Sequence, residues 1–243
     1  MPRRFWIPIA AVAALVVLGA GGAYAYFFSS LRTTPPTLAL ASASPTASSS
    51  ASPIATSAAG TGTWTVASGS LAGYRVKEQF VGQSSSHEAV ARTSAVSGQA
   101  TITQSGSTYV LSAATITVQL SSVASVDSVA GYNVTNRDRI VQQSLNVSSF
   151  PTAVFEAQSV ALPAGAAAGQ TVTVSVPGKL TIHGVTKDVT ANLQLRVSGT
   201  SAQIAGTIAT NMTDFGVNPP SIGFTTVQPA ITVEVSLQLT RSA

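Results

Sequence analysis

The sequence predicts an all-β fold. Four segments carry apolar residues at every second position, the pattern of strands with one buried face: 116–120, 172–176, 189–197 and 231–239. Only 8% of the residues are charged, so polarity comes mainly from serine and threonine hydroxyls, which are compatible with β-structure. One short helix is predicted, around residues 135–145.

The N-terminus predicts export from the cytoplasm. Arg3 and Arg4 precede an uncharged stretch, residues 5–28, whose 24 residues exceed the roughly 20 that cross a bilayer. Residues 1–28 are therefore either a signal peptide or an uncleaved membrane anchor. We favour the anchor, because the apolar run is longer than a usual signal core. This predicts a single-pass membrane protein with an extracytoplasmic C-terminal domain, or a secreted one after cleavage.

Residues 29–62 are rich in Ser, Ala, Thr and Pro and show no sustained apolar periodicity, which predicts a disordered tether or a glycosylated, wall-threading spacer. Residues 63–241 form the predicted folded domain. Three of the 12 basic residues lie within the first 32 positions, so the remainder has 9 basic and 8 acidic residues, a balance of +1. That balance argues against nucleic-acid binding. The absence of cysteine excludes disulfides and thiolate chemistry.

Four weaker strands, near 74–80, 96–102, 153–160 and 204–208, bring the count to eight. Gly, Asn, Ser and Thr residues separate these strands, which indicates antiparallel hairpins. Eight antiparallel strands in one domain must close into a barrel or stack as a sandwich. An eight-stranded barrel can be filled by side chains or can hold one small apolar ligand. The alternation changes phase across "HGVTKD", residues 183–188, and this predicts a hairpin in which His183 is a turn residue.

Three motifs resemble the YceI-like family, lipocalin-like proteins that bind polyisoprenoids. "GKLTIHGVTKDVT", residues 178–190, resembles the family's G-x-L-T-[IL]-H-G-V-T-[KR]-x-V-T hairpin. Residues 136–157 resemble its short helix and the strand after it, and "TDFGV", 213–217, resembles its D-[FY]-G-[IV] turn. The resemblance covers about 64–239. It implies an eight-stranded antiparallel lipocalin-like barrel with one short helix and a hydrophobic tunnel for a long prenyl chain.

The first strand departs from the common family pattern. It reads "SGSLAGYRVKEQF", without the histidine of many members, and resembles instead a branch that opens S-x-x-G-Y-R-V-x-E. Glu78 shares the parity of Val76 and Phe80, which predicts that it points inward and is paired or hydrogen-bonded in the barrel mouth. The predicted tunnel-lining residues are Tyr74, Val76, Phe80, Ile116, Val118, Phe155, Leu180, Ile182, Ile208, Phe215 and Phe224. The predicted head-group contacts are Glu78, Arg137, Arg139 and His183.

The predicted function is non-enzymatic: an extracytoplasmic protein that binds, sequesters or transports an isoprenoid or another apolar lipid. The alternative is a barrel with a filled core that acts as a surface interaction module. No catalytic residue is predicted, because no G-x-S-x-G elbow is present. His87 is predicted to lie in a mobile loop, and nothing in the spacing of His87 and His183 requires a metal or cofactor. Predicted partners are the lipid, the membrane through the N-terminal helix and a second copy in a homodimer, with no nucleic acid.

Overall fold

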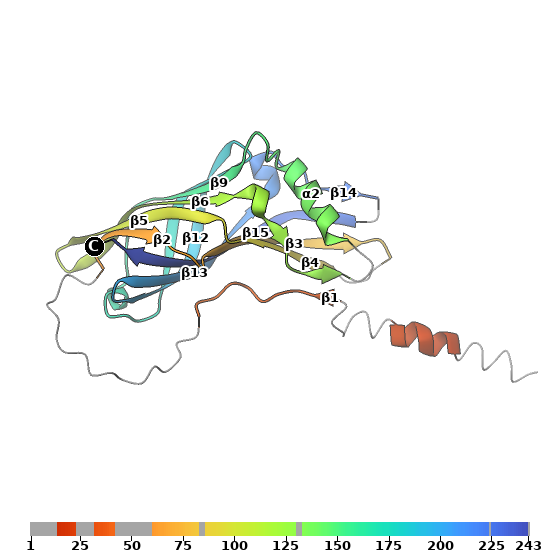
Figure 1. Ribbon diagram of the computed structural model, residues 1–243, viewed down its shortest axis with the longest axis horizontal. Helices are drawn as coiled ribbons and strands as arrows, with labels where there is room; N and C mark the ends of the chain where they lie inside the picture. The colour runs from red at the N-terminus through yellow and green to blue at the C-terminus, as the bar shows by residue number, and fades with distance from the viewer. Residues whose placement is uncertain are drawn as a thin grey trace, which may run out of the picture.

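The computed structural model describes residues 14–22, 32–41, 60–82, 86–129, 133–223 and 225–242. Eight strands form a closed antiparallel barrel, in which each strand pairs with the next and the ring closes where β13 pairs with β15 (Figure 1). In ring order these strands are β2 (Gly62–Val66), β5 (Val96–Ser105), β6 (Thr108–Gln119), β9 (Thr152–Ala157), β11 (Val172–Ile182), β12 (Val185–Ser198), β13 (Ser201–Asn211) and β15 (Thr225–Arg241). The predicted all-β, eight-stranded barrel is confirmed.

A second sheet segment branches from the barrel. β3 (Leu71–Phe80) follows β2 along the same edge of β15, and β4 (His87–Thr93) and β7 (Ala124–Ser125) extend it outward. The sequence signal therefore placed a strand at 74–80 correctly, but this strand lies beside the ring rather than in it. The remaining short strands are β1 (Arg32–Thr33), β8 (Ser128–Val129), β10 (Val160–Ala161) and β14 (Ser221–Ile222).

The predicted helix is α2 (Val134–Ser144). Asn133 caps it, because its side chain accepts a hydrogen bond from the Thr135 amide at 3.0 Å. Short 3-10 helices are η2 (Leu120–Ser122), η3 (Ala164–Ala166) and η4 (Met212–Phe215). Of the apolar N-terminal segment, residues 14–22 are described and helical. Among the described residues, no helix combines the length and apolar character needed to cross a bilayer.

The predicted hairpin at His183 is confirmed. β11 and β12 pair up to Ile182 and Val185, which leaves His183 and Gly184 as a two-residue turn. Their φ angles of 53° and 74° are those of a type I′ turn, whose twist matches that of the strands. The His183 Nδ1 donates to the Phe215 carbonyl at 3.2 Å, and its ring meets Phe150 edge-on at 5.1 Å. His183 therefore joins the hairpin to η4.

The predicted disorder of residues 29–62 is wrong for residues 32–41. Here β1 pairs with β8, and residues 34–41 run in extended conformation along the outside of the barrel (Figure 1). They are held by hydrogen bonds to barrel side chains, including one from the Arg196 guanidinium to the Ala41 carbonyl at 2.6 Å. Composition did not reveal this contact, because its stabilising groups come from distant strands.

The hydrophobic core lies inside the barrel. Along β11, Val174, Val176 and Leu180 are buried, whereas Thr173, Ser175 and Lys179 between them are exposed. Burying one such aliphatic side chain contributes about 1.5–3 kcal/mol to stability. The apolar residues whose alternation predicted the strands thus face the barrel interior, and the polar residues between them face solvent.

Candidate ligand-binding site

A central cavity of about 200 Å³ lies inside the barrel, and Tyr74 and Thr207 are the polar side chains in its lining. It is walled mainly by Val, Leu, Ile and Ala from β3 and the ring strands, with η4 at one end. The barrel interior is therefore not filled by side chains. This argues against the alternative prediction of a barrel with a filled core. The predicted residues that line this cavity are Tyr74, Ile116, Val118, Phe155, Leu180, Ile182, Ile208 and Phe215.

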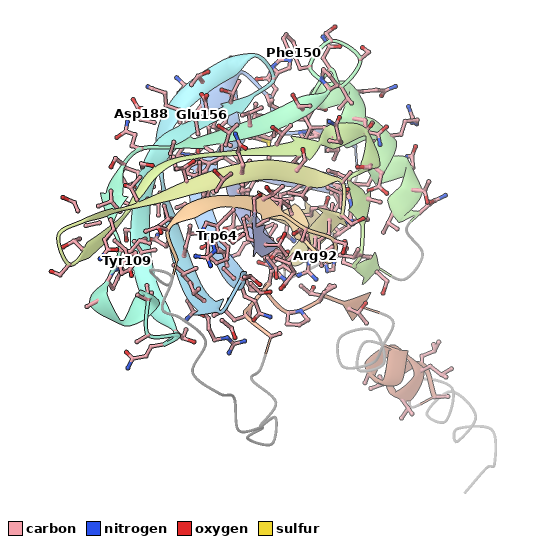
Figure 2. The ribbon with its side chains drawn as sticks, turned by 60° about the vertical axis from the view of Figure 1, so that its left-hand side comes forward. Trp64, Arg92, Tyr109, Phe150, Glu156 and Asp188 are labelled. Atoms are coloured by element: carbon pink, nitrogen blue, oxygen red, sulfur yellow. The ribbon has the colours of Figure 1, made fainter. Side chains whose placement is uncertain are left out.

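Two smaller cavities adjoin the central one. The far-end cavity, about 70 Å³, is lined by Trp64, Tyr109 and Ala166, and it shares wall residues such as Leu111 and Leu193 with the central cavity. Tyr109 and Phe150 mark opposite ends of the barrel in Figure 2. The helix-end cavity, about 100 Å³, is defined by α2 and the adjoining parts of β3 and β15.

The central and helix-end cavities share five wall residues, which are Tyr74, Leu145, Met212, Val217 and Ile231. The three spaces therefore follow one another along the barrel. This arrangement suits an elongated ligand better than a compact one.

A buried polar cluster forms one side of the helix-end cavity. Glu78, only 3% exposed, accepts a hydrogen bond from Arg137 Nη1 at 3.1 Å. Arg137 also donates to Asp127 and, from Nε and Nη2, to the Ser125 hydroxyl at 3.2 and 2.8 Å. Asp127 in turn bonds His87 Nε2 at 2.6 Å. The predicted pairing of Glu78 is confirmed, while its contact with a head group stays a prediction.

The electrostatics of this cluster follow from burial and from Arg137. Burial raises the pKa of Glu78, and the charge and hydrogen bond of Arg137 offset only part of this effect. Burial opposes ionisation of Asp127 too, but hydrogen bonds from His87 and Arg137 outweigh it and hold the pKa of Asp127 below its usual value. Asp127 is therefore a fixed negative charge next to Arg137.

Two hydroxyl groups of the cavities have unused hydrogen-bonding capacity. Burial raises the pKa of Tyr74, so its phenol stays neutral, and no hydrogen bond joins this hydroxyl to another described residue. Thr225 Oγ1, in the wall of the helix-end cavity, is buried and has no hydrogen-bond partner among the described residues. An unpaired buried hydroxyl costs about 1–3 kcal/mol, which a polar ligand group can recover.

The other predicted residues lie elsewhere. Val76 lines the helix-end cavity, whereas Phe80 is buried against the His87 ring, 6.5 Å away, and lines none of the three cavities. Arg139 is on the exposed face of α2, where it donates to Asn136 and Gln143. His183 is the turn residue described above. Phe224 lies outside the described residues.

His87 and Asp127 were missed by sequence reasoning. His87 begins β4 and is 2% exposed, so its predicted place in a mobile loop is wrong. Asp127 lies 40 residues further along the chain, and no sequence pattern links the two. Among the described residues, no three His, Cys, Asp or Glu side chains are grouped as metal ligands.

The family model for the YceI-like domain matches residues 64–239. The chain belongs to the YceI-like family. In this YceI-like domain, the motifs at 178–190 and 213–217 form the β11–β12 hairpin and the η4 turn against which His183 is bonded. No curated protein matches the chain significantly in sequence.

Solved structures share the fold. A polyisoprenoid binding domain from Saccharophagus degradans, implicated in plant cell wall breakdown, aligns with a TM-score of 0.52 and 15% identity over 74% of this chain and 98% of its own. BcnA from Burkholderia cenocepacia aligns at 0.47 and 17% identity, over 68% and 95%. The Campylobacter jejuni YceI protein aligns at 0.42 and 16% identity, over 69% and 86%. The first of these likenesses shows the same barrel architecture.

Proposed function

We propose that this YceI-like domain binds one long apolar lipid, an isoprenoid or a chain of similar shape, inside its barrel, and that it catalyses no reaction. The observation that carries the proposal is the run of three adjoining cavities with an almost wholly apolar central lining. Each buried CH₂ contributes about 0.8 kcal/mol, so a chain that fills these spaces gains affinity without many polar contacts. The Saccharophagus structure with the same fold is described as a polyisoprenoid binding domain, which supports this ligand class.

The polar end of this lipid is placed at the helix-end cavity and is uncharged. Glu78 and Asp127 both accept hydrogen bonds from Arg137, and Asp138 accepts one from the Ser125 hydroxyl to which Arg137 also donates, so in this described cluster three carboxylates outnumber one guanidinium. Arg137 already donates to Glu78, Asp127 and Ser125, which leaves it no free two-pronged face for a phosphate. A quinone or an alcohol can instead bond the Tyr74 and Thr225 hydroxyls.

We place this activity outside the cytoplasm, with the barrel tethered to a membrane by the N-terminal segment. Support comes from Arg3 and Arg4 ahead of the uncharged residues 5–28, since basic residues stay on the cytoplasmic side. In this setting the domain would carry or sequester its lipid beside the membrane from which the lipid comes.

Native mass spectrometry of the full chain, purified with membrane lipids present, tests the proposal. We expect one bound lipid per chain, identifiable after organic extraction. If the chain is isolated empty, it is incubated with a prenyl quinone, a prenyl alcohol and a prenyl phosphate of equal chain length. Preferential uptake of the uncharged pair supports both parts of the proposal, uptake of the phosphate refutes the uncharged head group, and no uptake refutes lipid binding.

A further inference from the structure

A second charged cluster lies on the outer surface of the barrel, on the faces of β3, β4 and β15 that point away from the cavities. Glu234 of β15 accepts from Arg75 Nε of β3 at 2.8 Å and from Arg92 Nε of β4 at 2.7 Å. Arg75 Nη1 also bonds Glu88 at 2.8 Å. We call these residues, Arg75, Arg92 and Glu234, together with Arg196 of β12, the docking face. Figure 2 shows Arg92 on this side of the barrel.

Residues 34–41, "TPPTLALA", lie on this face and are held chiefly through their main chain. Arg75 Nη2 donates to the Pro35 carbonyl at 2.6 Å, and Arg92 Nη2 donates to the Pro36 carbonyl at 2.5 Å. The Leu38 amide donates to Glu234 Oε2 at 3.2 Å. Arg196 completes the set through the Ala41 carbonyl. The guanidinium groups of three arginines therefore donate hydrogen bonds to carbonyl groups of one extended segment.

The docking face is built for such a segment. Glu234 is fully buried and Arg75 is 6% exposed, although both point away from the barrel interior. A buried carboxylate is costly unless it is fully hydrogen-bonded, and here the third donor is the Leu38 amide of the docked segment. Pro35 and Pro36 have no N–H to leave unpaired and hold their backbone extended, which lowers the entropy cost of docking.

We propose that the docking face is a binding site for an extended, proline-containing peptide segment, and that residues 34–41 of the same chain occupy it. Docking of these residues holds the N-terminal apolar segment at the α2 end of the barrel. The pairing of β1 with β8 places Arg32 beside Val129, five residues before α2 begins. With the segment docked, residues 29–31 alone join residue 28 to β1, and three residues span at most about 11 Å. Without docking the connection is residues 29–59, which can span about 110 Å.

Amide hydrogen exchange on the full chain tests docking. We expect the Leu38 amide to be protected, and the double variant Arg92→Lys/Arg196→Lys to lower this protection at least tenfold. Lysine keeps the charge but lacks the second N–H donor that reaches the segment. Arg139→Lys, on the exposed face of α2, is the matched control and should change nothing. Unprotected exchange at Leu38 in the parent chain, or equal protection in the double variant, would overturn the proposal.

Two further measurements test the occupant and its consequence. A photo-crosslinker at the exposed Thr37, in a mixture of ¹⁴N- and ¹⁵N-labelled chains, should join the segment to β3, β4 or β15 of its own chain; mixed-isotope products would overturn docking within one chain. Because the chain has no cysteine, spin labels can be placed at Thr33→Cys and Arg139→Cys alone. A narrow distance distribution that broadens in the Arg92→Lys/Arg196→Lys background is expected, and a broad one in the parent background refutes the placement. None of these readouts depends on lipid binding.

Discussion

Replacing Arg137 with Met tests whether the buried cluster stabilises the fold. Glu78 accepts a hydrogen bond from Arg137 and is 3% exposed, so Arg137→Met leaves this carboxylate buried and without that partner. It then takes up a proton, because burial already raises the pKa of Glu78. Protonating a glutamate of ordinary pKa, about 4.3, at pH 7 costs about 1.36 × 2.7, or about 3.7 kcal/mol. This falls within the roughly 3–5 kcal/mol typical of a broken buried ion pair.

The loss of unfolding free energy in Arg137→Met should depend on pH. The folded-state pKa of the unpaired Glu78 lies above its unfolded value, so the penalty is absent below the unfolded pKa and grows as the pH rises. At pH 5 the part of the cost that comes from Glu78 should therefore be only about 1 kcal/mol, from 1.36 × 0.7. Urea unfolding followed by the fluorescence of Trp64, which is 3% exposed, measures both values. Arg139→Met, on the solvent face of the same helix, should cost less than about 0.5 kcal/mol. A loss below 1 kcal/mol at pH 7, or an equal loss at pH 5, would refute the assignment.

Three other outcomes are expected. Leu180→Trp should fill the central cavity and lower lipid uptake at least tenfold, while unfolding stays cooperative. Lys179→Trp, on the outer face, should take up lipid normally. Equal uptake by the two variants would exclude Leu180 from the site. The stability contribution of Asp127, whose pKa is lowered, should be present at neutral pH and disappear as the pH falls below about 3.8; urea unfolding of Asp127→Asn should lack this acid slope. Gly106→Ala should lower the free energy of unfolding by about 1 kcal/mol, because alanine is strained at the positive φ of this residue. Gly184→Ala should lower it further in the same assay, because the new Cβ would also lie 2.6 Å from the Phe150 ring.

The sequence predicted those parts of the fold that depend on local periodicity. Apolar alternation located the strands, and the change of phase after Ile182 located the His183–Gly184 turn. Parity alone also placed Glu78 on the inner face of β3, where the cluster with Arg137 lies. These features are predictable because each arises from residues that are neighbours in the chain.

The parts that were missed depend on contacts between distant residues. His87 looked like a loop residue because its partner, Asp127, lies on the far side of two strands. Residues 34–41 looked disordered because their own side chains bury little, and their order comes from Arg75, Arg92 and Arg196. The alternation also could not show that β3 leaves the ring, since β2 and β3 share one edge of β15.

The distribution of charge connects the two proposals. The chain has eight acidic residues, and five of them lie in two clusters: Glu78, Asp127 and Asp138 at the helix-end cavity, and Glu234 of the docking face with Glu88, which bonds Arg75. A fold that needed charge only for solubility would spread these groups over its surface, where each costs little. Here the first cluster surrounds the polar end of an apolar cavity, and the second binds the segment that leads to the N-terminal apolar stretch. Because β3 contributes Glu78 to the first cluster and Arg75 to the second, a single strand carries residues of the proposed lipid site on its inner face and of the docking face on its outer face.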